Sequence, residues 1–123
     1  MSAPDLAAAA TVIDIASGVV DAATRRLAAA GSIDDHQVLA YDLAHAAAAV
    51  ATAEGLLDYG AKGDLEGRIT CAFVADAVGE LAGKVFGRED DWGVEPGALD
   101  GTRAFVGTYR APEFLAGIAD PGP

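Results

Sequence analysis

The sequence is poor in cysteine and aromatic residues, and it has no segment typical of export. Cys71 is the only cysteine, so no disulfide can form within the chain, and this usage fits a reducing compartment. The first basic residues are Arg25 and Arg26, so no positively charged region precedes an apolar run, as it does in a secretory signal. No uninterrupted apolar segment approaches the roughly 20 residues that span a bilayer. We therefore expect a cytoplasmic protein.

Positive charge is also scarce. The chain carries 8 basic and 19 acidic residues, which gives a formal net charge of −11. Nucleic acids and anionic membranes are themselves polyanions and repel such a chain. We expect no nucleic acid and no membrane as a partner, and an acidic, solvated surface that favours solubility.

Glycine-rich nucleotide-binding motifs are absent, because neither a G-x-G-x-x-G segment nor a Walker-type loop occurs. What the sequence does have is an apolar share of 52%, in which alanine dominates. A chain of 123 residues is long enough for one hydrophobic core but not for two. Because alanine fills little space, elements that pack through it must lie close together.

Apolar residues recur at steps of three and four in three long stretches, which predicts three helices. The first helix is expected to start near Ser2, with the hydroxyl as its cap and with Pro4 and Asp5 in its first turn. Gly31 is a natural stop for it. Its apolar stripe consists of Leu6, Ala9, Ile13, Ala16, Val20, Ala23 and Leu27.

The second and third helices are expected at residues 35–60 and 64–87, joined by a link at 60–63 that permits only an antiparallel return. Their core stripes are Leu39, Leu43, Ala46, Val50, Ala53 and Leu57 in the second helix and Cys71, Val74, Val78, Leu81 and Val85 in the third. Each helix has a second flank that is expected to be buried as well. The flanks are Val38, Tyr41, His45, Ala49, Thr52 and Leu56, and Ile69, Phe73 and Ala77. Gly55 and the pair Gly79 and Gly83 are expected at close crossings with another element.

The composition changes after Gly87. Residues 88–97 are charged and then rich in glycine and proline, which predicts a loop. A shorter fourth helix at residues 98–109 and one or two helical turns at 113–119 follow. We predict an all-α fold, an up-down antiparallel helical bundle of three long helices plus one shorter, with a short terminal helical turn. The bundle domain comprises residues 1–119, and residues 120–123 are a linker or a frayed terminus.

Few residues are candidates for chemistry. Asp42 and His45 are three apart on one helix, like half of the Glu-x-x-His pair of di-iron bundles, but no second copy exists and His36 lies outside the core stripe. Cys71 has an apolar position with no histidine near it on its own helix, which favours a buried structural thiol. We predict no catalytic residue and no metal site, and we leave cofactor-binding residues unassigned.

The aromatic residues of the last third allow two interpretations. Trp92 is either a plug for the end of the bundle or an anchor for a partner. A second group either closes the open side of the core or docks on a larger body, and we favour closure because packing is the commoner use of such residues. This group consists of Phe105, Tyr109, Phe114 and Leu115.

Three segments between residues 37 and 86 carry a family pattern: Tyr-Asp-Leu-Ala at 41–44, Leu-Leu-Asp-Tyr-Gly-Ala at 56–61 and Cys-Ala-Phe-Val-Ala-Asp-Ala at 71–77, followed by Gly87. With them the chain resembles the carboxyl-terminal helical domain of acyl-CoA dehydrogenases. Over most of its length it is similar to an amino-terminal helical extension that precedes the catalytic core in some actinobacterial members. The resemblance implies a parent FAD-dependent acyl-CoA dehydrogenase whose core would begin at residues 120–123.

The departures from the family imply a domain without chemistry of its own. The flavin-contacting Arg-Phe-Gly segment, the middle strand domain and the initial helical domain are missing. The family's catalytic Glu-Gly-Thr is echoed only at residues 100–102, where Asp100 has no partner groups to help it act as a base. We expect that the chain alone binds no FAD and is no enzyme. FAD is implied only for the parent flavoenzyme.

The resulting hypothesis is a noncatalytic helical domain that packs against a flavoenzyme core, or against like subunits in a homo-oligomer, through its helix faces. The alternative is a free-standing helical bundle that acts as a protein–protein interaction scaffold. A coding sequence that continues past Pro123 into a flavoenzyme core would favour the first hypothesis, and a stop codon there would favour the second.

Overall fold

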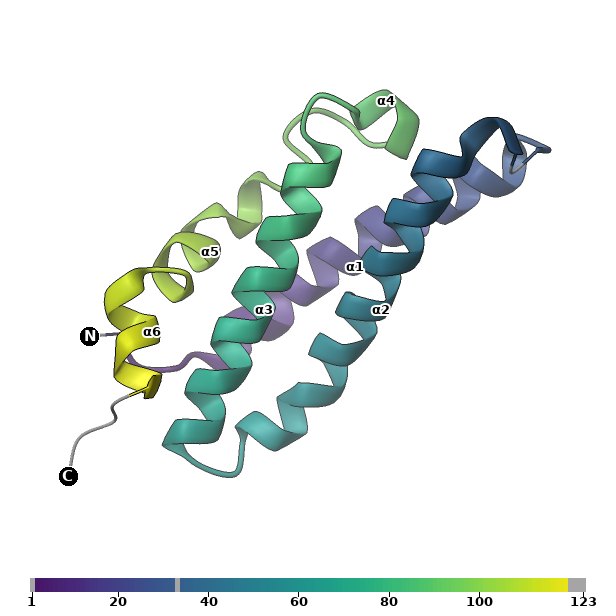
Figure 1. Cartoon of the computed structure of the whole chain (residues 1–123). Coiled ribbons are helices and arrows are strands. Elements are labelled where there is room, and N and C mark those ends of the chain that lie inside the picture. Colours follow the sequence, from purple (N-terminus) through teal and green to yellow (C-terminus); the bar gives the residue numbers. More distant parts are fainter. Residues whose placement is uncertain (1, 33, 120–123) are drawn as a thin grey trace.

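The computed structural model describes residues 2–32 and 34–119, and this part of the chain is all-helical, as predicted, with no strand (Figure 1). The long helices are α1 (Leu6–Ala29), α2 (Gln37–Gly60) and α3 (Asp64–Val85). The short helices are α4 (Glu89–Trp92), α5 (Arg103–Tyr109) and α6 (Pro112–Ala119), and two 3₁₀ turns lie at Asp34–His36 and Asp100–Thr102. The predicted linker at 120–123 lies outside the described residues.

The first helix begins later than the sequence predicted. Its cap is Asp5, whose carboxylate accepts a hydrogen bond of 2.9 Å from the backbone N–H of Ala8, and Ser2 is not part of the cap. An aspartate carries a full negative charge at the positive end of the helix dipole, so it is at least as good a cap as serine. The apolar stripe is confirmed: its five central residues are buried, and Leu6 and Leu27 are half-buried at its ends.

Among the described helices, α1 alone is long and apolar enough to cross a membrane by length and composition. A helix at the centre of a bundle meets the same two criteria. Here the buried side of α1 packs against both α2 and α3, and its flanks contact α4 and α5.

The hairpin of α2 and α3 confirms both core stripes but not the second flank of α2. Five of the six stripe residues of α2 and all five of α3 are buried. The flank predicted to be buried is mostly exposed instead: Val38, Tyr41, His45 and Thr52 are exposed, and Ala49 and Leu56 are half-buried. The physical reason is that α5 and α6 pack on α3 and leave α2 with α1 and α3 as its only extensive helical neighbours among the described elements.

The close crossing of helices lies at glycines other than those predicted. A Cβ atom at Gly55 or Gly83 would meet nothing within 4 Å, and at Gly79 it would meet the side chain of Arg110 rather than a backbone. The tight contact is at Gly60 and Gly67, where α2 and α3 turn into each other and where Gly60 O would lie 3.3 Å from a Cβ on Gly67. The glycines that let α2 and α3 approach closely are therefore those beside the α2–α3 link.

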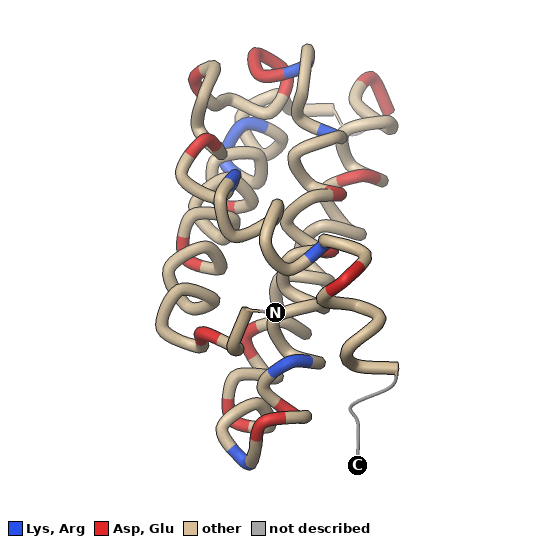
Figure 2. The backbone as a smooth tube through the Cα atoms, turned by 90° about the vertical axis from the view of Figure 1, so that its left-hand side faces the viewer, with Lys and Arg blue, Asp and Glu red and all other residues tan. Residues whose placement is uncertain are grey.

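The last third of the chain closes the bundle on the α3 side. The predicted loop at 88–97 contains α4, and the predicted fourth helix at 98–109 is divided into the 3₁₀ turn and α5, because Gly101 and the residues before it do not continue an α-helix. Phe105, Tyr109 and Phe114 are buried against the core, which confirms closure, whereas Leu115 is exposed. Acidic positions lie along the length of the bundle and in the turns at its ends (Figure 2).

Candidate functional site

The Asp42 and His45 pair is used for structural contacts. Nη1 of Arg88 donates a hydrogen bond of 2.9 Å to Oδ2 of Asp42, so the carboxylate that a metal would need is held by a guanidinium. The ring of His45 packs against the ring of Tyr41 at an angle of 53°, with 4.5 Å between their centroids. In the parts of the chain that the structure describes, no three histidine, cysteine or acidic side chains come together as metal ligands would.

Cys71 is buried, as predicted, on the side of α3 that faces the start of the chain. Burial raises the pKa of its thiol above the ordinary value of 9.0, and the carboxylate of Asp5 raises it further, although a hydrogen bond from the Asp5 backbone opposes this. The reactive species of a cysteine is the thiolate. A buried thiol that stays protonated at neutral pH has a packing role rather than a nucleophilic one.

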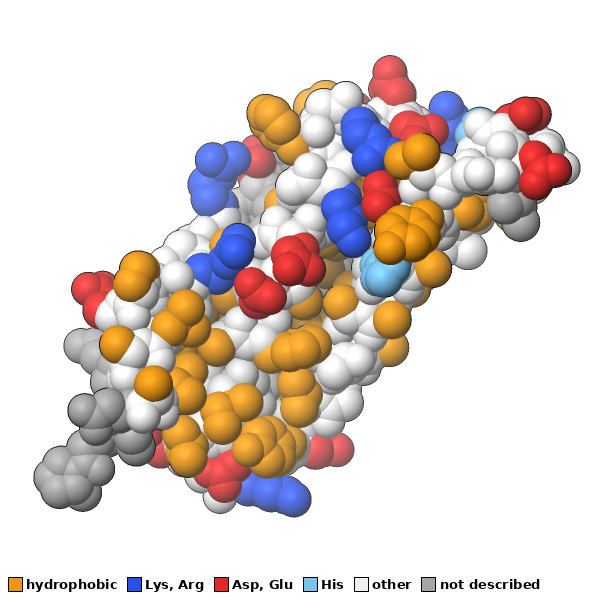
Figure 3. Space-filling view, viewed as in Figure 1, with side chains coloured by type: hydrophobic (Ala, Val, Ile, Leu, Met, Phe, Trp, Pro, Cys, Tyr) orange, Lys and Arg blue, Asp and Glu red, His pale blue; other side chains and the backbone are white. Residues whose placement is uncertain are grey.

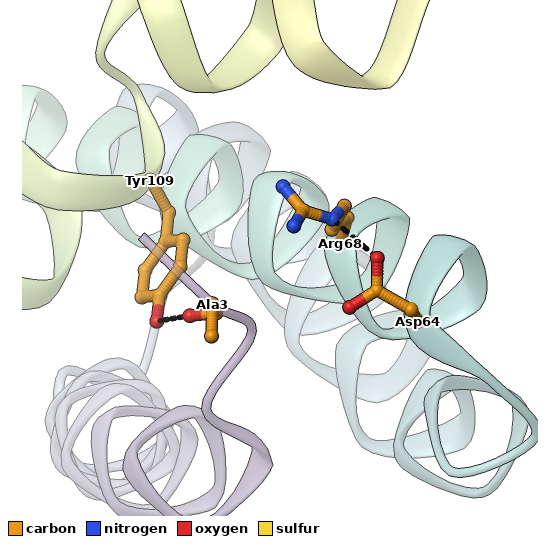
Figure 4. A network of polar contacts seen from close by, with 4 residues as sticks. All are labelled: Ala3, Asp64, Arg68 and Tyr109. Carbon is orange, nitrogen blue, oxygen red and sulfur yellow. Dashed lines mark hydrogen bonds and ion pairs between the residues drawn. The ribbon is translucent and has the colours of Figure 1, made fainter. Parts of the chain in front are cut away.

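A network of contacts that local sequence patterns do not predict ties the two ends of the described chain together (Figure 4). The hydroxyl of Tyr109 donates a hydrogen bond of 2.7 Å to the carbonyl of Ala3, and the ring of Phe114 packs edge-on against the ring of Tyr109. On α3, Nε of Arg68 donates to Asp64 at 2.6 Å while its guanidinium lies 5.8 Å from the centre of the Phe114 ring. These contacts join α5 to the start of the chain and to α6, and they join α6 to α3.

Trp92 is a plug for the end of the bundle, which decides between its two interpretations. Its side chain is completely buried, and Gly93 beside it lies against Arg26 of α1. The indole Nε1–H has no hydrogen-bond partner within the described residues. Leaving this group unpaired is unfavourable, and the burial of the large apolar ring offsets that free energy. Trp92 is therefore not available to anchor a partner.

Asp100 is exposed and forms an ion pair of 3.3 Å with Arg103, its neighbour three residues on. It lies on the rim of an open cavity of about 440 Å³ between α3 and residues 95–110. No histidine lines this cavity, and the ion-pair partner of Asp100 is a guanidinium rather than a group that would help it act as a base.

A further feature is the outer side of the α2–α3 hairpin, where side chains of both helices are exposed or half-buried. We call it the outer seam and define it as the following residues: Val38, Tyr41, His45, Ala49, Thr52 and Leu56 of α2, and Leu65, Ile69, Phe73 and Ala77 of α3. The exposed fractions of Tyr41 and Val38 are 66% and 64%. Figure 3 faces this side of the molecule and shows hydrophobic side chains gathered over the lower parts of α2, α3 and α6.

Polar contacts join the two helices beneath the outer seam. The hydroxyl of Thr70 shares its proton between the carbonyl of Leu56 on α2, at 3.2 Å, and the carbonyl of Glu66 on its own helix, at 2.9 Å. The Arg88–Asp42 pair joins the opposite end of the hairpin. The buried stripes of both helices lie on the inner side. The seam is therefore a preformed, partly apolar surface on fixed helices rather than a loop.

Comparison with known proteins finds no relative of this chain: no family model, no curated protein and no solved structure matches it.

Proposed function

We propose that this chain is a noncatalytic helical domain that acts by docking through its outer seam onto a partner protein. The observation that carries the proposal is the exposure of two large apolar side chains, Val38 and Tyr41, on the outer flank of α2, whose opposite side is buried. Large apolar side chains that stay in water on a rigid helix are typical of surfaces that are covered in an assembly.

Tyr41 is the best candidate for an anchor of this interface. Tyrosine is enriched among the residues that dominate binding energies, because it supplies a large contact area and loses few rotamers. Covering the exposed part of the Tyr41 side chain would stabilise a complex by roughly 2 kcal/mol at about 25 cal/mol per Å². Phe73 and Leu65 on α3 extend the apolar area on the other side of the seam.

The proposed partner is the catalytic core of an acyl-CoA dehydrogenase-like flavoenzyme, and this choice rests on the resemblance in residues 41–77. In this proposal α1, α2 and α3 form an up-down antiparallel bundle, and the helical domain shapes the flavoenzyme or its oligomer from outside the active site. FAD belongs to the partner. A scaffold that binds another class of protein would use the same seam.

Light scattering after size-exclusion chromatography tests this proposal directly. The purified chain is measured alone and with a flavin-loaded acyl-CoA dehydrogenase-like protein from the same genome. We expect a mixed complex that Tyr41→Glu abolishes, because the new carboxylate would have to be buried unpaired. Phe86→Glu is the matched control, since Phe86 is an aromatic residue that lies outside the seam and is even more exposed than Tyr41, at 85% against 66%.

Three results would contradict the proposal. One is a mixture that elutes as separate proteins, and another is a complex that survives Tyr41→Glu but not Phe86→Glu. The third concerns the noncatalytic part: a purified chain that binds FAD stoichiometrically and reduces a dye with acyl-CoA. A homodimer of the chain alone, lost on Tyr41→Glu, would keep the seam as the interface but replace the flavoenzyme with a second copy.

A further inference from the structure

A second surface feature is independent of the outer seam: the cavity between α3 and residues 95–110. Its volume of about 440 Å³ lies within the range of cavities that hold small molecules. Val85, Leu99 and Val106 supply apolar wall from α3, the loop and α5 respectively. The cavity is therefore large enough for a small molecule with an apolar body.

One side chain on the rim of this cavity is unusually exposed. Phe86 presents 85% of its surface to solvent, the largest exposed fraction among the exposed large hydrophobic residues of the described chain. Its backbone is fixed nevertheless, because its N–H donates to the carbonyl of Ala82 at 2.9 Å at the end of α3. The structure thus places an aromatic residue at the edge of a cavity, where the described part of the chain leaves most of its surface uncovered.

The free charge on the rim is negative. Arg103 is paired with Asp100 at 3.3 Å, and Arg110 is paired with Asp76 of α3 at 3.5 Å. Two further rim residues, Glu89 and Glu95, have no basic partner within the described part of the chain. The net charge of −11 adds a long-range attraction for cations.

We propose that this cavity binds a small organic cation, an apolar body that carries one ammonium or guanidinium group. The apolar body lies against Val85, Leu99 and Val106, and the cationic group lies toward Glu89 and Glu95. The ring of Phe86 is suited to cover the ligand and to attract its cation through the negative face of the π-system. An anionic amphiphile of the same size is repelled by the two glutamates.

Three probes of matched shape test the charge preference: 4-phenylbutylamine, 4-phenylbutanol and 4-phenylbutyrate. Each is titrated into the ¹⁵N-labelled chain while amide chemical shifts are followed by NMR. We expect the amine to shift amides of the cavity wall with a Kd of about 1 mM, and the carboxylate to bind at least about tenfold more weakly. Equal affinities, shifts on the outer seam, or no shifts up to about 10 mM amine would overturn the proposal.

Paired variants separate charge from general effects of mutation. The double change Glu89→Gln and Glu95→Gln keeps shape and hydrogen-bonding capacity, and we expect it to weaken amine binding about five- to tenfold, to the level of the alcohol. The matched control is Glu54→Gln with Glu80→Gln, two exposed glutamates that do not line the cavity. A control that weakens the amine as much as the rim variant does would show that only the overall charge matters, which would also overturn the proposal.

Discussion

Two glycines of α2, five residues apart, are expected to respond in opposite ways to the same substitution. Gly60→Ala places a Cβ atom 2.7 Å from Oγ1 of Thr70 and 3.0 Å from Cδ2 of Leu6. Gly55→Ala places it in open solvent, with nothing within 4 Å. Neither glycine has a positive φ angle, so backbone strain does not enter the comparison.

The magnitudes follow from these environments. At Gly60 the Thr70 side chain cannot simply move aside, because it is completely buried and its hydroxyl donates to Leu56 and Glu66. Overpacking of this kind costs about 1–3 kcal/mol in the free energy of unfolding. At Gly55 the exposed helix gains about 1 kcal/mol from the better helix propensity of alanine.

Thermal unfolding, followed by circular dichroism, measures both effects as changes in Tm relative to the unsubstituted chain. With about 4 °C for each kcal/mol in a chain of this size, we expect a Tm lower by roughly 4–12 °C for Gly60→Ala and higher by about 4 °C for Gly55→Ala. Equal Tm values for the two variants would refute the conclusion that α2 and α3 cross closely at Gly60.

Three further predictions concern other parts of the bundle. Tyr109→Phe removes the hydrogen bond to Ala3 and is expected to lower the free energy of unfolding by about 1 kcal/mol in a urea titration, with Tyr41→Phe as a control that changes nothing. Burial raises the pKa values of Cys71 and Tyr109, so the unfolded chain loses these protons first as pH rises. The free energy of unfolding that depends on these protonated groups is therefore fully present below pH 9.0 and decreases above it. A Cys71→Ala variant whose free energy of unfolding falls as much between pH 8 and 10 as that of the wild type would contradict this. Trp92 is expected to emit at short wavelength and to resist quenching by iodide, because its ring is completely buried; free quenching in the folded state would exclude its role as a plug.

The spacing of apolar residues correctly predicted the buried sides of the three long helices. The stripes of α1, α2 and α3 are buried as their spacing indicated, because a step of three and four places such residues on one side of a helix whatever they pack against. The same signal misjudged the outer flank of α2. The step from Tyr41 to His45 shows that these residues share a side, but it does not show whether another helix covers that side.

Contacts between distant segments were not predictable from local patterns. The Tyr109–Ala3 hydrogen bond joins residues 106 apart, and the Arg88–Asp42 pair joins residues 46 apart. The glycine at a crossing cannot be told from the glycine in solvent by composition, since Gly55 and Gly60 occur in the same helix. Trp92 is a further example. The charged residues before it predicted a loop, which does not show that its ring is buried in the core.

The central claim, a docking surface along the outer seam, is tested most directly by NMR cross-saturation of the labelled chain in the presence of the unlabelled flavoenzyme core. Saturation passes only to protons that contact the partner. We predict signal loss that centres on Val38, Tyr41 and Phe73 and spares α5. Loss centred on α5 and α6, or no loss at any residue, would contradict the claim.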